Sequence, residues 1–150
     1  MTNGAEVLVT YFDSSALVKL VLPEPGREAA RALWDASGRC VTSRLSAAEV
    51  SAALGAARRA RRISGAGLQR ARSVWADRHA EVTYVNLDRE VADLAVETTL
   101  RHALRGADAV QLASALVLGV HVVFACWDER LRLAAAAEGL ILAPADVREA

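Results

Sequence analysis

The sequence predicts an α/β fold, in which a mostly parallel central sheet of four to five strands carries helices on both faces. Two observations lead to this fold class. Short apolar runs alternate with stretches of helical periodicity along the chain, as they do in βαβ units. The length of 150 residues suits one domain, so we expect a single domain over 1–150 with a flexible N-terminus at 1–6.

Each element is predicted from a local pattern. The near-continuous apolar run at 7–12 is typical of a strand buried on both faces. Ser46 and Glu49 have the spacing of a capping box, which predicts that a helix begins at Ser46. The predicted strands are 7–12, 40–42, 82–87, 120–124 and 140–143. The predicted helices are 15–22, 25–36, 46–62, 64–79, 88–103, 107–118 and 128–138.

Composition excludes several classes of protein. Basic and acidic residues number 18 each, so the total charge does not favour a nucleic-acid partner. No apolar run approaches the roughly 18 residues that span a bilayer, and the first residues lack the features of a signal peptide. We therefore expect a cytoplasmic protein with no membrane partner. Cys40 and Cys126 lack the spacing of a disulfide framework or a zinc site, and glycine-rich phosphate loops are absent.

Four acidic residues occupy positions that suit an active site. Asp13 directly follows the first predicted strand and Asp128 closely follows the fourth, and α/β proteins bind ligands beyond the carboxyl ends of their strands. Asp108 and Glu49 lie on the apolar faces of their helices. A buried carboxylate is costly unless it is paired or binds a metal. Carboxylates that meet in one crevice suit Mg²⁺ or Mn²⁺, with waters completing the coordination shell.

Each acid also has a purely structural interpretation. Asp13 and Asp128 could be N-caps of the helices that follow them, and Glu49 could close its capping box. An acid in the first turn of a helix, such as Asp108, is favoured by the helix dipole. Both interpretations remain open for each residue when it is taken singly.

Four segments resemble the motifs of the PIN-domain ribonucleases, and in particular of the VapC-type toxins of bacterial toxin–antitoxin pairs. They occur in the family's order and span about 9–143. The resemblance implies a three-layer PIN-like fold. The segments are YFDSSALVKL with Asp13, VTSRLSAAEVSAAL with Glu49, LRGADAVQLASAL with Asp108, and FACWDERLRLAA with Asp128.

The resemblance also implies an activity. It indicates a magnesium-dependent endoribonuclease, with Mn²⁺ as a possible substitute, in which Asp13 and Asp108 are the firmest metal ligands. Glu49 and Asp128 would hold a second metal or orient water, and Ser15 would form a hydrogen bond within the acidic site. The implied partners are an RNA substrate, a small antitoxin that covers the cleft, and a second copy in a homodimer.

The chain departs from the family's pattern at two places. Cys126 stands where similar proteins often have Thr or Ser, and a thiol is a weaker hydrogen-bonding group around Asp128. Val110 and Gln111 stand where Leu and His are frequent; we expect this change to be tolerated because neither residue is an acid ligand. The alternative function is a catalytically degenerate PIN domain that binds RNA or protein. Cys126 favours it weakly, and the presence of all four acids argues against it.

The sequence lacks the residues that two other kinds of phosphate chemistry require. A metal-free ribonuclease needs paired histidines, and His79, His102 and His121 show no such pairing in the sequence. A haloacid-dehalogenase type of phosphatase also has an aspartate after its first strand, but it needs a second aspartate where this chain has Ser15.

A cluster of arginines follows Glu49 at the end of its predicted helix. The cluster begins roughly 14 Å from Glu49 along the helix axis, which is a few nucleotides' reach. It is either a track for RNA phosphates or a solvated helix C-terminus, where basic residues are favoured in any case. The candidate RNA-binding residues are Arg58, Arg59, Arg61 and Arg62.

Overall fold

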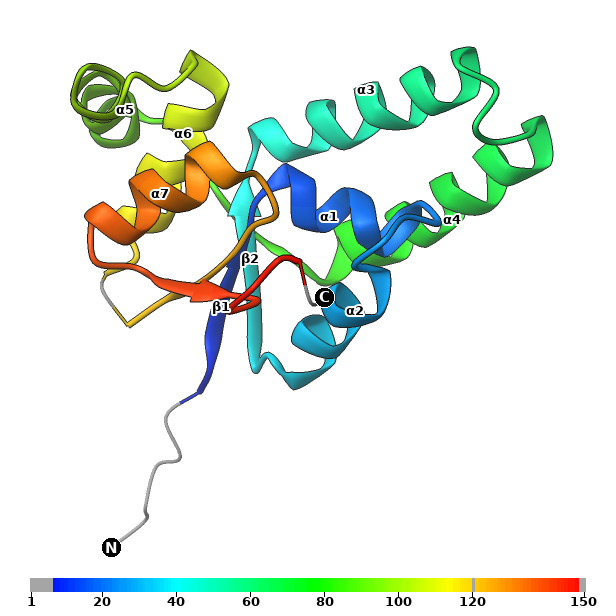
Figure 1. Cartoon of the computed structure of the whole chain (residues 1–150), viewed down its shortest axis with the longest axis horizontal. Coiled ribbons are helices and arrows are strands. Elements are labelled where there is room, and N and C mark those ends of the chain that lie inside the picture. Colours follow the sequence, from blue (N-terminus) through cyan, green and yellow to red (C-terminus); the bar gives the residue numbers. More distant parts are fainter. Residues whose placement is uncertain (1–6, 120, 149–150) are drawn as a thin grey trace, which may run out of the picture.

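A computed structural model describes residues 7–119 and 121–148, and within them a parallel sheet of five strands lies among seven helices (Figure 1). The strands are β1 (Val9–Phe12), β2 (Arg39–Ser43), β3 (Thr83–Val85), β4 (Val123–Ala125) and β5 (Ile141–Ala143). The helices are α1 (Ser14–Val21), α2 (Arg27–Ala36), α3 (Leu45–Arg59), α4 (Gly65–Glu81), α5 (Arg89–His102), α6 (Gly106–Leu116) and α7 (Glu129–Ala137). The flexible N-terminus predicted for 1–6 lies outside the described residues.

The strand order is β3-β2-β1-β4-β5, and every neighbouring pair is parallel. The chain therefore builds one side of the sheet from β1 to β3 and then returns to the other side of β1 with β4. This reversal makes the carboxyl ends of β1 and β4 the point where a ligand crevice forms in open α/β sheets. Asp13 follows β1, and Asp128 follows β4.

The sheet is the middle of three layers. Successive side chains of a strand point to opposite faces, and Tyr11 and Phe12 in β1 accordingly enter different cores. Tyr11 packs with buried residues of α5, α6 and α7, whereas Phe12 packs with those of α1 to α4. Both side chains are fully buried, which explains why the β1 segment is apolar without alternation. The predicted fold class, a three-layer α/β PIN-like fold, is confirmed.

The predicted start of the third helix is wrong. The helix begins at Leu45 with Arg44 at the N-cap position, and no side chain caps it. Ser46 lies inside the first turn, and its hydroxyl is paired with that of Thr42, 2.7 Å away. Glu49 therefore does not close a capping box. The first strand is also shorter than predicted, because Val7 and Leu8 precede its first ladder pair.

No helix within 7–119 or 121–148 is both long and apolar enough to cross a membrane.

Candidate active site

Asp13 follows β1, pairs with the end of β4 and is the N-cap of α1. Its backbone N–H donates to the carbonyl of Ala125 at the end of β4 (3.1 Å). Its Oδ1 atom accepts from the backbone N–H of Ala16 (3.0 Å) and from the hydroxyl of Ser15 (2.6 Å). Asp13 is thus the N-cap of α1, and its carboxylate is held in one orientation at the crevice between β1 and β4.

The other oxygen of Asp13 has a much weaker partner. The Cys126 thiol donates to Asp13 Oδ2 at a sulfur–oxygen distance of 3.3 Å. Burial raises the pKa of the Asp13 carboxyl to about 6, against the opposing effect of the hydrogen bonds from Ser15, Ala16 and Cys126. Burial also raises the pKa of the Cys126 thiol, so this side chain stays protonated and can act as the donor.

Cys126 acts at a different acid from the one that the sequence suggested. Its side chain contacts the carboxylate of Asp13, whereas its only contact with Asp128 is with the backbone carbonyl, 3.7 Å from the sulfur. The change from a hydroxyl to a thiol at this position therefore weakens the hydrogen bonding of Asp13.

Glu49 is half-buried on α3 and is held by residues from two other helices. Its Oε2 atom accepts hydrogen bonds from the Ser14 hydroxyl, at the start of α1, and from the Gln111 amide of α6, whose Nε2 is 2.6 Å away. The sequence predicted only that Gln111 is a tolerated change because it is not itself an acid ligand; its contact with Glu49 was missed. A fully polar side chain on the apolar face of a helix was the pattern that could have identified it.

Asp108 and Asp128 complete the acidic group. Asp108 lies in the first turn of α6, and Asp128 is the N-cap of α7, where its Oδ1 accepts from the Leu131 N–H (2.9 Å). Partial burial raises the pKa of Asp108, and the charges of Asp128 and Glu49 raise it further, while Arg105 and Arg130 oppose the shift. These three carboxylates therefore repel one another across the crevice.

An open pocket of about 440 Å³ is lined by Glu49, Asp128 and a further acid, Glu24, whereas Asp13 and Asp108 do not line it. Its wall combines polar groups of the site with one aromatic ring and one lysine. The Lys19 ammonium lies 5.5 Å from the centre of the Trp127 ring and donates to the Pro25 carbonyl (2.7 Å), so it does not pair with the four candidate acids. The lining residues near the acids are Ser14, Ser15, Lys19, Glu49, Trp127 and Asp128.

The donor set of this pocket suits a hard divalent cation. Among the described residues, none of the four carboxylates forms a salt bridge, although the charges of all four are electrostatically coupled. Residues 7–119 and 121–148 contain no compact group of three or more acidic, histidine or cysteine side chains placed to enclose a metal. Mg²⁺ does not need such a cage, because it usually takes one or two carboxylates and keeps several waters.

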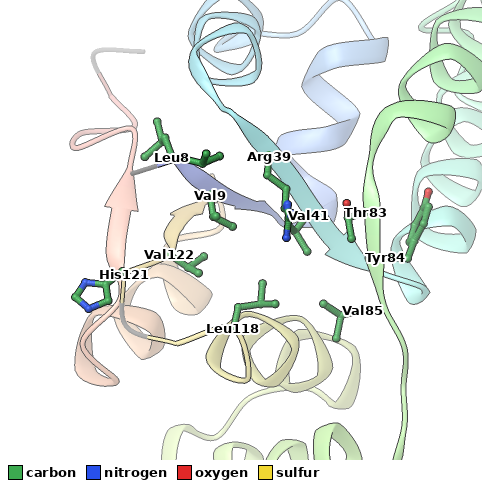
Figure 2. A pocket seen from close by; sticks show the side chains of 11 residues that line it. Leu8, Val9, Arg39, Val41, Thr83, Tyr84, Val85, Leu118, His121 and Val122 are labelled. Carbon is green, nitrogen blue, oxygen red and sulfur yellow. The ribbon is translucent and has the colours of Figure 1, made fainter. Parts of the chain in front are cut away.

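A second pocket, of about 530 Å³, lies at the opposite end of the strands (Figure 2). Figure 2 shows Val9, Val41 and Val122 around it, with the Arg39 side chain among them. The wall is largely aliphatic, and none of the four acids lines it. This pocket therefore offers no groups for the chemistry that the acidic pocket suits.

Comparison with known proteins places these features in a family. The family described as PIN domain matches residues 10–137, a span that includes all four acids. The chain belongs to the PIN-domain family. Ribonuclease VapC45 of Mycobacterium tuberculosis is 44% identical to this PIN domain over 140 residues, which cover 93% of this chain and 97% of the relative.

Two solved structures share the fold of this PIN domain. The crystal structure of PAE2754 from Pyrobaculum aerophilum matches with a TM-score of 0.67 at 17% identity, covering 99% of this chain and 92% of the other. A toxin–antitoxin complex from Klebsiella pneumoniae contains a chain that matches with a TM-score of 0.56 at 20% identity, covering 79% and 86%. At these identities the likeness concerns the fold.

The predicted arginine cluster of this PIN domain does not line the acidic pocket, but one of its members, Arg62, contacts Glu24, which does. The helices α3 and α4 pack side by side as a hairpin that extends away from the sheet, and the cluster lies at its tip (Figure 1). All four arginines are exposed, and Arg62 pairs with Glu24 across 3.5 Å. The cluster comprises Arg58, Arg59, Arg61 and Arg62.

Proposed function

We propose that this PIN domain is a magnesium-dependent endoribonuclease and the toxin of a toxin–antitoxin pair. The observation that carries the proposal is a set of four electrostatically interacting carboxylates, none of which forms a salt bridge within the described residues: Asp13 and Asp128 follow β1 and β4, and Glu49 and Asp108 lie on α3 and α6. It is supported by the 44% identity to a VapC ribonuclease over nearly the whole chain.

The residues have distinct roles in this proposal. Asp13 would hold the cation through Oδ2, because Oδ1 is occupied by the Ala16 N–H and the Ser15 hydroxyl. Asp108 would be the other firm ligand, and it accepts no hydrogen bond from the part of the chain that the structure describes. Glu49 and Asp128 would each contribute an oxygen to a second cation or orient water, and Mn²⁺ could replace Mg²⁺ at such oxygen ligands.

The bound cation supplies two chemical effects: it lowers the pKa of a water molecule and neutralises charge that develops on the scissile phosphate. The chain itself fixes the ligands, because Asp13 and Asp128 are held by the N-termini of α1 and α7. Hydrolysis of this kind uses no 2′-hydroxyl attack, and its products would carry a 5′-phosphate and a 3′-hydroxyl.

The proposed partners follow from the same family. A small antitoxin would cover the acidic pocket, and the toxin would be a cytoplasmic homodimer. Large apolar side chains exposed on α5 and α7 offer surface for such contacts: Leu100 is 81% and Leu133 is 73% exposed. The toxin–antitoxin complex that shares this fold supports the pairing as a proposal.

The second candidate function is a degenerate PIN domain that binds RNA or protein without cutting. Two observations favour it: the weak thiol donor beside Asp13, and the lack, within the described residues, of three side chains gathered around one metal position.

Cleavage by the purified protein tests the proposal. We expect RNA to be cut in Mg²⁺ and to remain intact in excess EDTA. Asp108→Asn should lower the cleavage rate by about 100-fold or more, since even indirect partners of a metal are worth roughly 10–100-fold.

The matched control for this variant is Asp93→Asn, an exposed acid of α5 that pairs with Arg89, and it should cleave like the wild type. Cleavage that is unchanged in EDTA would contradict the metal mechanism. RNA binding without cleavage in any divalent ion would favour the degenerate domain.

A further inference from the structure

A chain of hydrogen bonds connects the central strand to Glu49. The Tyr11 hydroxyl of β1 donates to Gln111 Oε1 on α6 (2.5 Å), and Gln111 Nε2 donates to Glu49 Oε2 on α3 (2.6 Å). Tyr11 is 0% and Gln111 is 2% exposed, so water does not compete for the bond between them, whereas the bond to Glu49 is partly buried. Three separate elements thus meet through one amide.

The orientation of that amide is fixed from both ends. A carboxylate oxygen only accepts, so the nitrogen of Gln111 faces Glu49 and the oxygen faces Tyr11. The Tyr11 hydroxyl carries a hydrogen to donate, and the amide oxygen of Gln111 is its acceptor. If the Gln111 amide were flipped, its Oε1 would face Glu49 Oε2, and two acceptors would meet without a hydrogen. The buried Tyr11 hydroxyl would then face the amide nitrogen and would have to accept.

The same contacts leave the two oxygens of Glu49 unequal. Oε2 is occupied by Ser14 and Gln111, and within the described residues no hydrogen bond reaches Oε1. Glu49 lines the acidic pocket, so its carboxylate presents Oε1 there in a set orientation. Gln111 lies one helical turn after Asp108 on α6, which means that one helix carries both an acid of the site and the support of another acid.

We propose that Gln111 is a positioning residue that orients Glu49 for binding a divalent cation, with Tyr11 fixing the orientation of the Gln111 amide. This inference rests on the proposed metal-dependent function. Partners of this kind orient metal ligands, and their loss weakens metal affinity by about 10–100-fold. If Gln111 only filled space and satisfied Tyr11, its loss would lower stability and leave metal affinity unchanged.

Three variants distinguish a positioning role of Gln111 from a role in stability alone. Gln111→Met keeps the length of the side chain and removes the hydrogen bonds to Tyr11 and Glu49, together with those that the amide nitrogen donates to the hydroxyls of Ser14 and Ser46. Gln111→His restores the bonds to Tyr11 and Glu49, because one nitrogen of a neutral imidazole accepts while the other donates. Tyr11→Phe removes the hydroxyl but keeps the ring that stacks on Phe124 at 5.6 Å. The control is Thr98→Val, which removes a fully buried hydroxyl of α5 that bonds only Ala95.

The first measurement is the dissociation constant for Mn²⁺, by electron paramagnetic resonance on the full chain without RNA. The second is the cleavage rate as a function of Mg²⁺ concentration, and the third is the unfolding midpoint in EDTA. We expect Gln111→Met to weaken Mn²⁺ binding by about 10–100-fold and to raise the half-saturating Mg²⁺ concentration likewise. Gln111→His should recover affinity to within a few-fold, Tyr11→Phe should weaken it less than Met does, and Thr98→Val should lower only the unfolding midpoint.

Each other outcome has a definite meaning. Wild-type Mn²⁺ affinity in Gln111→Met, with a lowered unfolding midpoint, overturns the inference, and so does a histidine variant that binds as poorly as the methionine variant. If Gln111→Met shows no cooperative unfolding, Tyr11→Phe carries the same expectation, and unchanged affinity in that variant overturns the inference. A wild type that neither binds Mn²⁺ nor cuts RNA refutes the proposed function itself, which is a separate result.

Discussion

The two oxygens of the Asp13 carboxylate have different environments. This difference makes helix capping compatible with the proposed metal binding. Oδ1 caps α1, whereas among residues 7–119 and 121–148 the Cys126 thiol is the only hydrogen-bond partner of Oδ2. Asp128 repeats the arrangement, because one of its oxygens caps α7. An N-cap uses one lone pair of a carboxylate, so capping and metal binding are compatible at the same residue.

Replacing Asp13 by asparagine should stabilise the protein, and the gain should depend on pH. The folded state holds the Asp13 proton more tightly than the unfolded state, because burial raises the pKa from 3.8 to about 6. Wild-type stability therefore falls as the pH rises through this range and stays reduced above it. Asparagine caps a helix as well as aspartate and cannot ionise. We expect a gain of about 2–3 kcal/mol near pH 8 and almost none near pH 4.

Urea unfolding in EDTA measures this difference. Asp88→Asn is the matched control, because Asp88 also caps a helix, is exposed and lies outside the acidic group. A pH-independent effect of Asp13→Asn would show that the ionised Asp13 carboxylate is not penalised in the folded protein.

At the scale of elements, Arg132 secures the loop between β4 and α7. Its guanidinium is buried and donates to the carbonyls of Cys126 (2.9 Å), Pro144 (2.8 Å) and Ala145 (3.0 Å). The loop that carries Asp128 is thereby joined to the chain that follows β5. The charge is solvated by backbone carbonyls in place of water.

Arg132→Leu should destabilise the protein by about 2–3 kcal/mol, because it leaves the buried carbonyl of Cys126 and the partly buried carbonyls of Pro144 and Ala145 without this donor. Chemical denaturation gives this value. Arg130→Leu is the control on the same helix: Arg130 is exposed and reaches one carbonyl, that of Ala103, so its loss should cost under about 1 kcal/mol. Equal effects of the two variants would show that water replaces the Arg132 guanidinium.

Local patterns predicted the order and type of the elements, because the apolar residues of each strand and helix recur with the period of that element. They failed where a tertiary contact outweighs a local one. Ser46 has the right spacing for a cap, but its hydroxyl is committed to Thr42. The support of Glu49 could not be predicted for the same reason, because Gln111 lies 62 residues away in sequence.

At the scale of the whole molecule, the four candidate acids and most of the arginine cluster are separated. Asp13 and Asp128 follow the carboxyl ends of β1 and β4, and the cluster lies at the tip of the α3–α4 hairpin (Figure 1), where Arg62 contacts Glu24 of the acidic pocket. Under the proposed function, an RNA long enough to reach both would be held at the tip and cut at the sheet. The sequence predicted the cluster but left two interpretations open, since a solvated helix end has the same composition.

Replacing Arg58 and Arg59 with glutamine should raise KM for a long RNA and leave kcat unchanged. The slope of log affinity against log salt concentration should fall by about 0.7 for each phosphate that the variant no longer neutralises. Arg89→Gln, at an exposed site on α5, should change neither quantity. An unchanged salt slope in the double variant would identify the cluster as a solvated helix end.

The position of β1 between β2 and β4 has a consequence for the protein during its synthesis. Asp13 leaves the ribosome more than a hundred residues before Ala125, with which its backbone N–H is paired, and the crevice beside it is closed by β4. A parallel sheet assembled from distant segments forms late, after the intervening chain is available. The nascent chain therefore lacks a complete acidic site until β4 and Asp128 have been translated, and a product truncated before β4 carries the first acid without the last.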